Sequence, residues 1–250
     1  MMRSTMLRKT LRGIITAFFW LLVWYITAEI IDKELFLPTP FRVIERFIEL
    51  SQSIEFWKIT AVSLVRIMCG FGIGVIFGSL FAFVTHYLPF AKTLLSPALK
   101  TVRATPVVSF ILLAFLWLNA DLIPVFIAFL MVLPIIWENI AAGLDNLDNS
   151  LIEMSRVYRM SRNTRFSKII MPSISPYFYS GCFTSLGLAW KSGIAAEVIS
   201  YPSIAIGREM NSAKVVLETA DVMVWTVVVV VLSMVMEKLF KTLFKRRTLE

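Results

Sequence analysis

Residues 153–172 read EMSRVYRMSRNTRFSKIIMP, a basic and polar stretch between two long hydrophobic blocks of the chain. Its cations recur every third residue, as Arg156, Arg159, Arg162, Arg165 and Lys168. On a helix this spacing gives a slowly rotating charged stripe, with apolar residues on the other face. The pattern predicts an organised surface segment, although the same charges also fit a solvated loop that only fixes membrane topology.

The residues before this stretch predict where its helix begins. Asp145 and Asn146 are typical of a helix stop, and Asp148 or Ser150 is suited to cap a new helix. Glu153 would then lie in the first turns, where the helix dipole favours a negative charge. We expect Pro172 to end the segment before the next hydrophobic block begins.

Composition indicates a membrane protein. Of the 250 residues, 58% are hydrophobic and 17% are charged, whereas soluble domains carry roughly 25% charged residues. Six segments approach the ~20 apolar residues that a membrane helix needs: 13–31, 60–86, 96–118, 122–143, 174–199 and 221–241. Between the first two, apolar Phe41, Ile44 and Ile48 alternate with charged residues and predict an amphipathic surface helix.

The distribution of Lys and Arg predicts the orientation of these spans. With the N-terminus inside, the inner segments hold four cations in 1–13, three in 87–103, five in 144–173 and five in 237–250. The outer segments hold six in total. This positive-inside bias places both termini and the loop 144–173 in the cytoplasm.

Two of the predicted spans have a small residue at every fourth position. Gly70, Gly74 and Gly78 do so in the second span, and Gly181 and Gly193 belong to a similar series in the fifth. Small residues at this spacing let helices approach closely in lipid. Ordinary helix packing explains them, and a moving interface between these two spans is the alternative.

Ionisable residues within spans mark buried pairs or translocation paths. Arg66 and Glu197 lie at similar depth, so they are predicted to form an ion pair or to line the path. Lys191 lies six residues from Glu197 on a different helix face. Lys191 is expected either to extend its amine toward the membrane surface or to a backbone carbonyl, or to contact an anionic solute. Glu138, in the predicted fourth span, is a further candidate for an ion pair, and its partner is not assigned.

Catalytic and metal-binding motifs are absent from the sequence. It contains no phosphate-binding loop of the G-x-x-x-x-G-K-[ST] type, no cluster of metal-ligand spacing and no G-x-S-x-G serine. We therefore expect no catalytic residue, no metal site and no bound cofactor in this chain, and no enzymatic activity of its own.

The stretch resembles the E-A-A-x3-G-x9-I-x-L-P loop of ATP-binding-cassette importer permeases. Glu153 matches the family Glu, and Met154 and Ser155 match the two Ala. Ile169 matches the Ile, and Met171-Pro172 match Leu-Pro. Residues 36–40 (FLPTP), 103–107 (RATPV) and 185–199 are similar to the nitrate/sulfonate/taurine group of these permeases.

This resemblance implies an all-α polytopic membrane protein of the type I importer permease fold, with six transmembrane helices and one permease domain over 1–250. The loop 144–173 would contain a cytoplasmic coupling helix that contacts the ATPase. Residues assigned to this coupling role are Glu153, Met154, Ser155, Arg156, Arg159, Ser161, Arg162, Arg165, Ile169, Met171 and Pro172.

Arg159 departs from the family pattern, which has glycine at this position. Glycine permits a left-handed backbone that costs other residues roughly 1 kcal/mol or more. We expect Arg159 to stay helical and the bend to shift to Ser161 or Asn163, which suit a helix cap. Tolerated strain at Arg159 is the alternative.

The resemblance also implies partners and a location. These are two ATPase subunits that bind ATP and magnesium, an extracytoplasmic solute-binding protein and a second permease copy, most simply in a homodimer, in a bacterial cytoplasmic membrane. The solute would be a small anion such as a sulfonate, taurine or nitrate, or else a vitamin precursor such as a pyrimidine. A membrane scaffold whose basic loop binds anionic lipid is the alternative from a different class. No feature predicts binding to nucleic acid.

Overall fold

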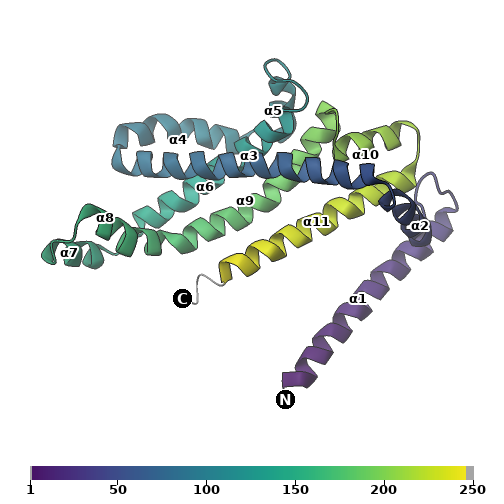
Figure 1. The fold of residues 1–250 in the computed structure, drawn as a ribbon, viewed down its shortest axis with the longest axis horizontal. Coiled ribbons are helices and arrows are strands. Elements are labelled where there is room, and N and C mark those ends of the chain that lie inside the picture. Colours follow the sequence, from purple (N-terminus) through teal and green to yellow (C-terminus); the bar gives the residue numbers. More distant parts are fainter. Residues whose placement is uncertain (1, 246–250) are drawn as a thin grey trace. The chain divides into compact units, whose positions relative to one another are not determined.

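The computed structural model describes residues 2–245, and every regular element in that part of the chain is a helix (Figure 1). The elements are α1 (Met2–Ile31), α2 (Pro40–Ser51), α3 (Ile54–Tyr87), α4 (Pro89–Ala104), α5 (Val107–Ala114), α6 (Ile123–Asp145), α7 (Asn149–Val157), α8 (Arg162–Arg165), the π-helical turn η1 (Phe166–Ile170), α9 (Met171–Ser200), α10 (Ile206–Val215) and α11 (Thr219–Lys245). The expectation of an all-α fold is confirmed.

The chain divides into two compact units. One comprises the residues up to Lys58 together with Glu209–Val230, and it holds α1 and α2. The other comprises Ile59–Arg208 and the residues from Val231 onward, and it holds α4 to α9. Every residue predicted to belong to the coupling loop or the translocation path lies in this second unit.

Three helices among the described residues are long and apolar enough to cross a membrane: α3, α6 and the Thr219–Thr242 part of α11. A fourth span is obtained if α4 and α5 are counted together, and Ile15–Ile31 is a shorter apolar helix. Helix α9 has 30 residues, but Lys191, Glu197 and several serines reduce its hydropathy. The count of six spans therefore remains a prediction.

The segment predicted as one span, 96–118, is bent in the structure. Helix α4 ends at Ala104, and α5 begins at Val107 after a bend of 104°. Thr105 is extended, with ψ of 136°, because the ring of a following proline disfavours the helical conformation. Pro106 also lacks the N–H that would continue the α4 hydrogen-bond ladder. The apolar composition of residues 96–118 predicts the length of a span, but it does not predict this bend.

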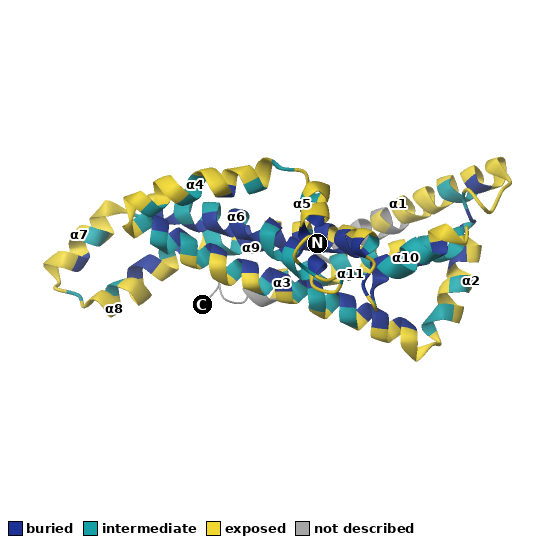
Figure 2. Cartoon of the chain, turned by 90° about the horizontal axis from the view of Figure 1, so that it is seen from above, coloured by how far each residue is buried: buried dark blue, intermediate teal, exposed yellow. Residues whose placement is uncertain are grey.

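The second unit is built around α6 and α9, which lie side by side (Figures 1 and 2). Both helices bury one face, while α7 and α8 at the end of the unit are mostly exposed (Figure 2). Ile127, Val132 and Ile136 of α6 are fully buried. These contacts fix the frame from which the loop 144–173 projects.

The small residues of α3 make close contacts with α6. A Cβ built on Gly74 would lie 2.6 Å from Cβ of Val132, and one on Gly78 would lie 2.8 Å from Cβ of Ile136. Separations this short exclude a side chain, so these glycines allow the two backbones to approach. On α9, Gly193 meets Ile67 of α3 in the same way, at 2.7 Å. The glycine series thus has a packing explanation within the unit.

The amphipathic surface helix predicted around 41–49 is confirmed as α2, in the first unit. Thr39 caps it by accepting a hydrogen bond from the N–H of Arg42. Its apolar side chains Phe41, Ile44 and Ile48 are exposed. Its charged face is tied to α11 by Arg46, which pairs with Asp221.

Candidate functional site

The helix predicted to follow Asp148 begins there. The carboxylate of Asp148 accepts hydrogen bonds from the hydroxyl and the N–H of Ser150, the latter at 2.8 Å. These bonds lower the pKa of Asp148 and keep it in the charged form that caps best. Helix α7 then carries Glu153 on its exposed surface and buries Ser155 against its own turn.

Helix α7 ends in a left-handed turn at Arg159, which has a φ of 48°. The N–H of Arg159 donates to the carbonyl of Arg156 at 3.0 Å, and the N–H of Met160 donates to that of Ser155 at 2.9 Å. These two bonds form the Schellman motif that usually has glycine at the position of Arg159. The expectation that Arg159 stays helical and the bend shifts is therefore wrong.

Ser161 caps the next helix, as its residue type suggested. Its hydroxyl accepts a hydrogen bond from the N–H of Thr164 at 3.2 Å. The chain thus bends at Arg159, and the next helix is capped two residues later at Ser161. The presence of a good capping residue at Ser161 does not move the bend there. Arg162 and Asn163 follow in the exposed first turn of α8.

The left-handed backbone at Arg159 leads to a prediction about the stability of the folded chain. Arg159→Gly is expected to stabilise the chain by about 1 kcal/mol, because it removes the steric cost of a Cβ in this conformation. The measurement is the thermal unfolding midpoint of the purified protein, with Arg162→Gly as the matched control. Since Arg162 has an ordinary helical backbone in the first turn of α8, that glycine should not stabilise the chain. A lower midpoint for Arg159→Gly than for the unchanged chain would contradict the assignment.

Pro172 does not end the segment, contrary to expectation. Helix α8, the π turn η1 and helix α9 follow one another without a break, so one helical rod extends from Arg162 to Ser200. In η1 the N–H of Met171 reaches back five residues to the carbonyl of Phe166. Such a π turn accommodates the missing N–H of a nearby proline.

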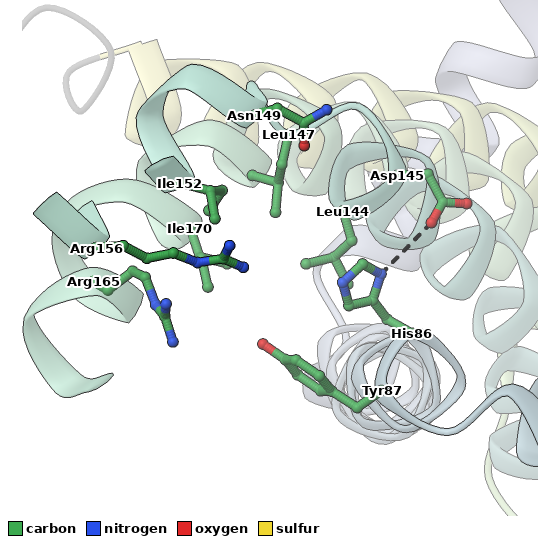
Figure 3. Close-up of a pocket in the computed structure, with 10 residues that line it drawn as sticks. All are labelled: His86, Tyr87, Leu144, Asp145, Leu147, Asn149, Ile152, Arg156, Arg165 and Ile170. Atoms are coloured by element: carbon green, nitrogen blue, oxygen red, sulfur yellow. Dashed lines mark ion pairs between the residues drawn. The ribbon is translucent and has the colours of Figure 1, made fainter. Parts of the chain in front are cut away.

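A cavity of about 640 Å³ lies between this segment and the adjacent ends of α3 and α6 (Figure 3). Arg156 of α7 and Arg165 of α8 extend into it from one side, and His86 and Tyr87 line the other (Figure 3). Asp145 is already engaged, at 3.5 Å from His86 and 3.3 Å from Lys92. The cationic stripe is therefore divided between the cavity and the outer surface.

The remaining members of the predicted coupling set have distinct positions. Glu153, Met154, Arg159 and Arg162 are exposed, as are Met171 and Pro172. Ile169 is buried, with only 6% of its surface exposed. Phe166 contacts Phe83 of α3, with ring centroids 5.8 Å apart. The segment thus presents charged and polar groups outward and anchors itself through apolar residues of η1.

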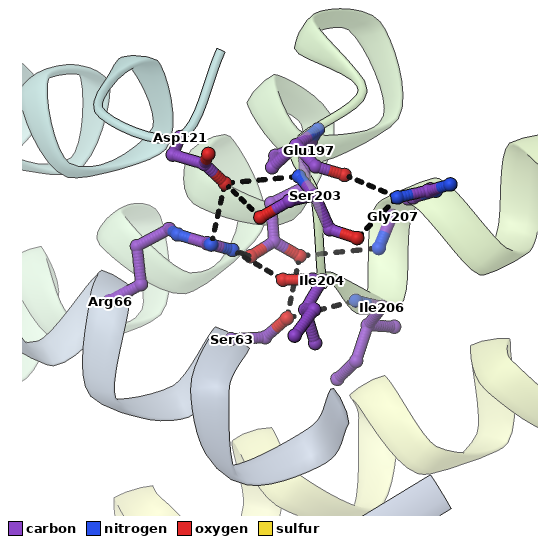
Figure 4. A network of polar contacts seen from close by, with 10 residues as sticks. Ser63, Arg66, Asp121, Glu197, Ser203, Ile204, Ile206 and Gly207 are labelled. Atoms are coloured by element: carbon purple, nitrogen blue, oxygen red, sulfur yellow. Dashed lines mark hydrogen bonds and ion pairs between the residues drawn. The ribbon is translucent and has the colours of Figure 1, made fainter. Parts of the chain in front are cut away.

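A second polar cluster joins α3 to the loop after α9 (Figure 4). The guanidinium of Arg66 donates to Glu197 at 3.0 Å and to the carbonyl of Ile204 at 3.0 Å. Glu197 is fully buried and also accepts from the Ser63 hydroxyl at 2.9 Å and the Gly207 N–H at 3.2 Å. Each charge has several partners, which is the condition for a stable buried ion pair.

Asp121 completes this cluster, and sequence patterns did not identify it. It accepts hydrogen bonds from the N–H and hydroxyl of Ser203 at 3.0 and 2.9 Å, and lies 3.2 Å from Arg66. Burial raises the pKa of Asp121, but the bonds from Ser203 and the nearby Arg66 outweigh this effect and lower it. Asp121 lies in the three residues between the predicted spans 96–118 and 122–143, and an acidic residue there was a signal for a cationic partner.

Lys191 belongs to neither cluster. It is exposed on α9, whereas Glu197 lies buried one and two-thirds turns further along. Glu138 pairs with Arg103, a residue that had been counted only as a loop cation. Among the described residues, no group of three or more His, Cys, Asp or Glu is arranged to hold a metal ion.

Comparison with known proteins gives one consistent family. Residues 74–248 match the sequence profile of the binding-protein-dependent transport system inner membrane component. A permease of Escherichia coli (strain K12) named for aliphatic sulfonate transport, SsuC, is 33% identical over 75% of this chain and 72% of that protein. The taurine transport system permease protein TauC of the same organism is 24% identical over 91% of this chain and 85% of its own length.

Two further matches extend the comparison. The bicarbonate transport system permease protein CmpB of Synechococcus elongatus is 26% identical over 61% of this chain and 55% of its own length. A crystal structure of an amino acid ABC transporter with histidines superposes with a TM-score of 0.62 at 18% identity. It covers 78% of this chain and 96% of the other, and at this identity it supports the fold alone.

Proposed function

Because this chain belongs to the binding-protein-dependent transport system inner membrane component family, the permeases of ATP-binding-cassette importers, we propose that it translocates a small solute of the sulfonate, taurine, nitrate or bicarbonate class. The chemistry of ATP hydrolysis would lie in separate subunits. This chain would supply the path across the membrane and the surface on which those subunits act.

The observation that carries this proposal is the exposed α7–α8 segment at the end of a continuous helix. Glu153 and Arg162 are on its surface, and α8 continues through η1 into α9 without a loop. A partner that grips α7 and α8 would therefore move α9 directly. This supports the role of a coupling helix for residues 144–173, in which the charges act as mechanical contacts and have no catalytic part.

The remaining features of the proposal rest on the resemblance to this family. The chain would form one permease domain over 1–250 with six spans and both termini in the cytoplasm. It would assemble as a homodimer with two ATPase subunits and receive its solute from an extracytoplasmic binding protein. The excess of Lys and Arg in the segments assigned to the cytoplasm supports this orientation.

The test is reconstitution. The chain is co-expressed with a candidate ATPase subunit and a candidate solute-binding protein, and the purified complex is placed in vesicles with taurine, ethanesulfonate or bicarbonate. We expect a stoichiometric ATPase and ATP-dependent uptake of at least one of these probes. If no ATPase co-purifies and the chain alone binds anionic vesicles in a salt-sensitive manner, the importer role is refuted in favour of a lipid-binding scaffold.

A further inference from the structure

A second cavity lies at the corner between α4 and α5, inside the second unit. Its volume is about 280 Å³, and α4, α6 and α9 line it. That is close to the lower end of the ~300–1,000 Å³ typical of small-molecule sites. Most of its wall is apolar, and its polar groups come from Arg103, Glu138, Asn139 and Thr184.

The position of the charged pair in this cavity is unusual. Glu138 lies in α6, one of the helices apolar enough to span a membrane, and Arg103 lies in the last turn of α4 just before the 104° corner. The two side chains form an ion pair. Charges within spans are costly and tend to mark the paths of solutes, and interrupted helices occur where a span lines a binding site.

This pair differs from Arg66–Glu197 in its access to a ligand. Arg66 and Glu197 are 10% and 0% exposed and are surrounded by protein partners. Arg103 and Glu138 are 58% and 37% exposed beside an open cavity. A guanidinium has five N–H donors and a carboxylate about four acceptor positions, so both groups retain capacity for a solute after binding each other.

The neighbouring polar residue is held in a fixed position. The amide nitrogen of Asn139 donates to the carbonyl of Ile135 at 2.8 Å. A Cβ on Gly181 would lie 3.0 Å from Cβ of Asn139, so the missing side chain makes room for it between α6 and α9. The cavity thus offers a positive group from α4 and a negative and a neutral polar group from α6.

From this arrangement we infer that Arg103 and Glu138 bind a small zwitterion, with an anionic sulfonate or carboxylate on Arg103 and an amine on Glu138. A simple anion on Arg103 would bring a second negative charge close to the Glu138 carboxylate, and the two like charges would repel each other. A zwitterion supplies an opposite charge to both groups at once. This inference rests on the proposed transport function and names its solute class.

The test uses the complex of this chain with its ATPase in lipid nanodiscs, without the binding protein. Three probes that share a two-carbon chain are titrated: 2-aminoethanesulfonate, ethanesulfonate and ethylamine. Affinity is measured from the shift in thermal unfolding. We expect the zwitterion to bind at least about threefold more tightly than ethanesulfonate, because only the zwitterion places a cation beside Glu138. Glu138→Gln should reduce this ratio to about one, and Arg103→Gln should weaken both sulfonates.

Controls separate this inference from its rivals. Lys100→Gln removes an exposed cation of the same helix and should change no affinity. The reversed pair, Arg103→Glu with Glu138→Arg, should fold like the unchanged chain and retain the preference for the zwitterion.

The inference is refuted if ethanesulfonate binds as tightly as the zwitterion, if none of the probes binds, or if Lys191→Gln rather than Arg103→Gln abolishes binding. Absence of ATP-driven uptake by the unchanged complex with its binding protein would instead refute the transport function itself.

Discussion

Arg162→Glu is expected to reduce ATP-driven uptake at least about tenfold while the ATPase remains bound and continues to hydrolyse ATP. Arg162 lies exposed in the first turn of α8, at the start of the rod that becomes α9. A tenfold loss corresponds to ~1.4 kcal/mol, which lies within the ~1–3 kcal/mol typical of the coupling free energy between two sites. Glu153→Ala and Arg165→Glu should act in the same direction, the latter from inside the cavity.

The measurement compares uptake with ATP hydrolysis in vesicles that contain equal amounts of complex. Lys100→Glu supplies a charge reversal of the same size outside residues 144–173, and it should leave the ratio of uptake to hydrolysis unchanged. If the Arg162→Glu, Glu153→Ala and Arg165→Glu complexes import normally with their ATPase bound, the segment has no coupling role.

Glu197→Ala is expected to destabilise the protein by about 3–5 kcal/mol, the usual result of removing one partner from a buried ion pair. Arg66 is only 10% exposed, and it would lose its closest buried counter-charge. The Ser63 hydroxyl and the Gly207 N–H would lose their acceptor in the same step. The readout is the thermal unfolding midpoint of the purified chain.

A matched control is available on α2. Glu45→Ala breaks the Arg42–Glu45 pair, whose side chains are 44% and 60% exposed, and should cost less than about 1 kcal/mol. The double variant Arg66→Met with Glu197→Leu should recover much of the loss, since apolar residues of similar volume often replace a buried pair without penalty. Equal effects of Glu197→Ala and Glu45→Ala would show that the buried cluster is not stabilising.

Much of the helical architecture could be predicted because its causes are local. Apolar runs of the right length predicted α3, α6 and α11, and the alternation around Phe41 and Ile44 predicted α2. Asp148 and Ser161 predicted the starts of α7 and α8, because a capping side chain bonds to N–H groups only two or three residues away.

The features that were missed depend on backbone geometry or on distant residues. Pro106 was a signal for the corner after α4, but a count of apolar residues is insensitive to chain direction. The left-handed turn at Arg159 is maintained by hydrogen bonds to the end of α7, which outweigh the preference of its side chain. The partners of Arg66 and Glu138 lie far along the chain, so spacing could not identify Asp121 or Arg103.

The π turn η1 has a consequence for how this sequence can change in length. A π turn arises when one extra residue is accommodated in an α-helix, so η1 holds the surplus residue between α8 and α9. Deleting one residue from Phe166–Ile170 would restore an ordinary helix and rotate α8 by about 100° around the axis of α9. The surface that carries Arg162 would then face another direction. An insertion or deletion in η1 therefore changes the direction in which α8 faces. For this reason the structure constrains the number of residues between Glu153 and Pro172.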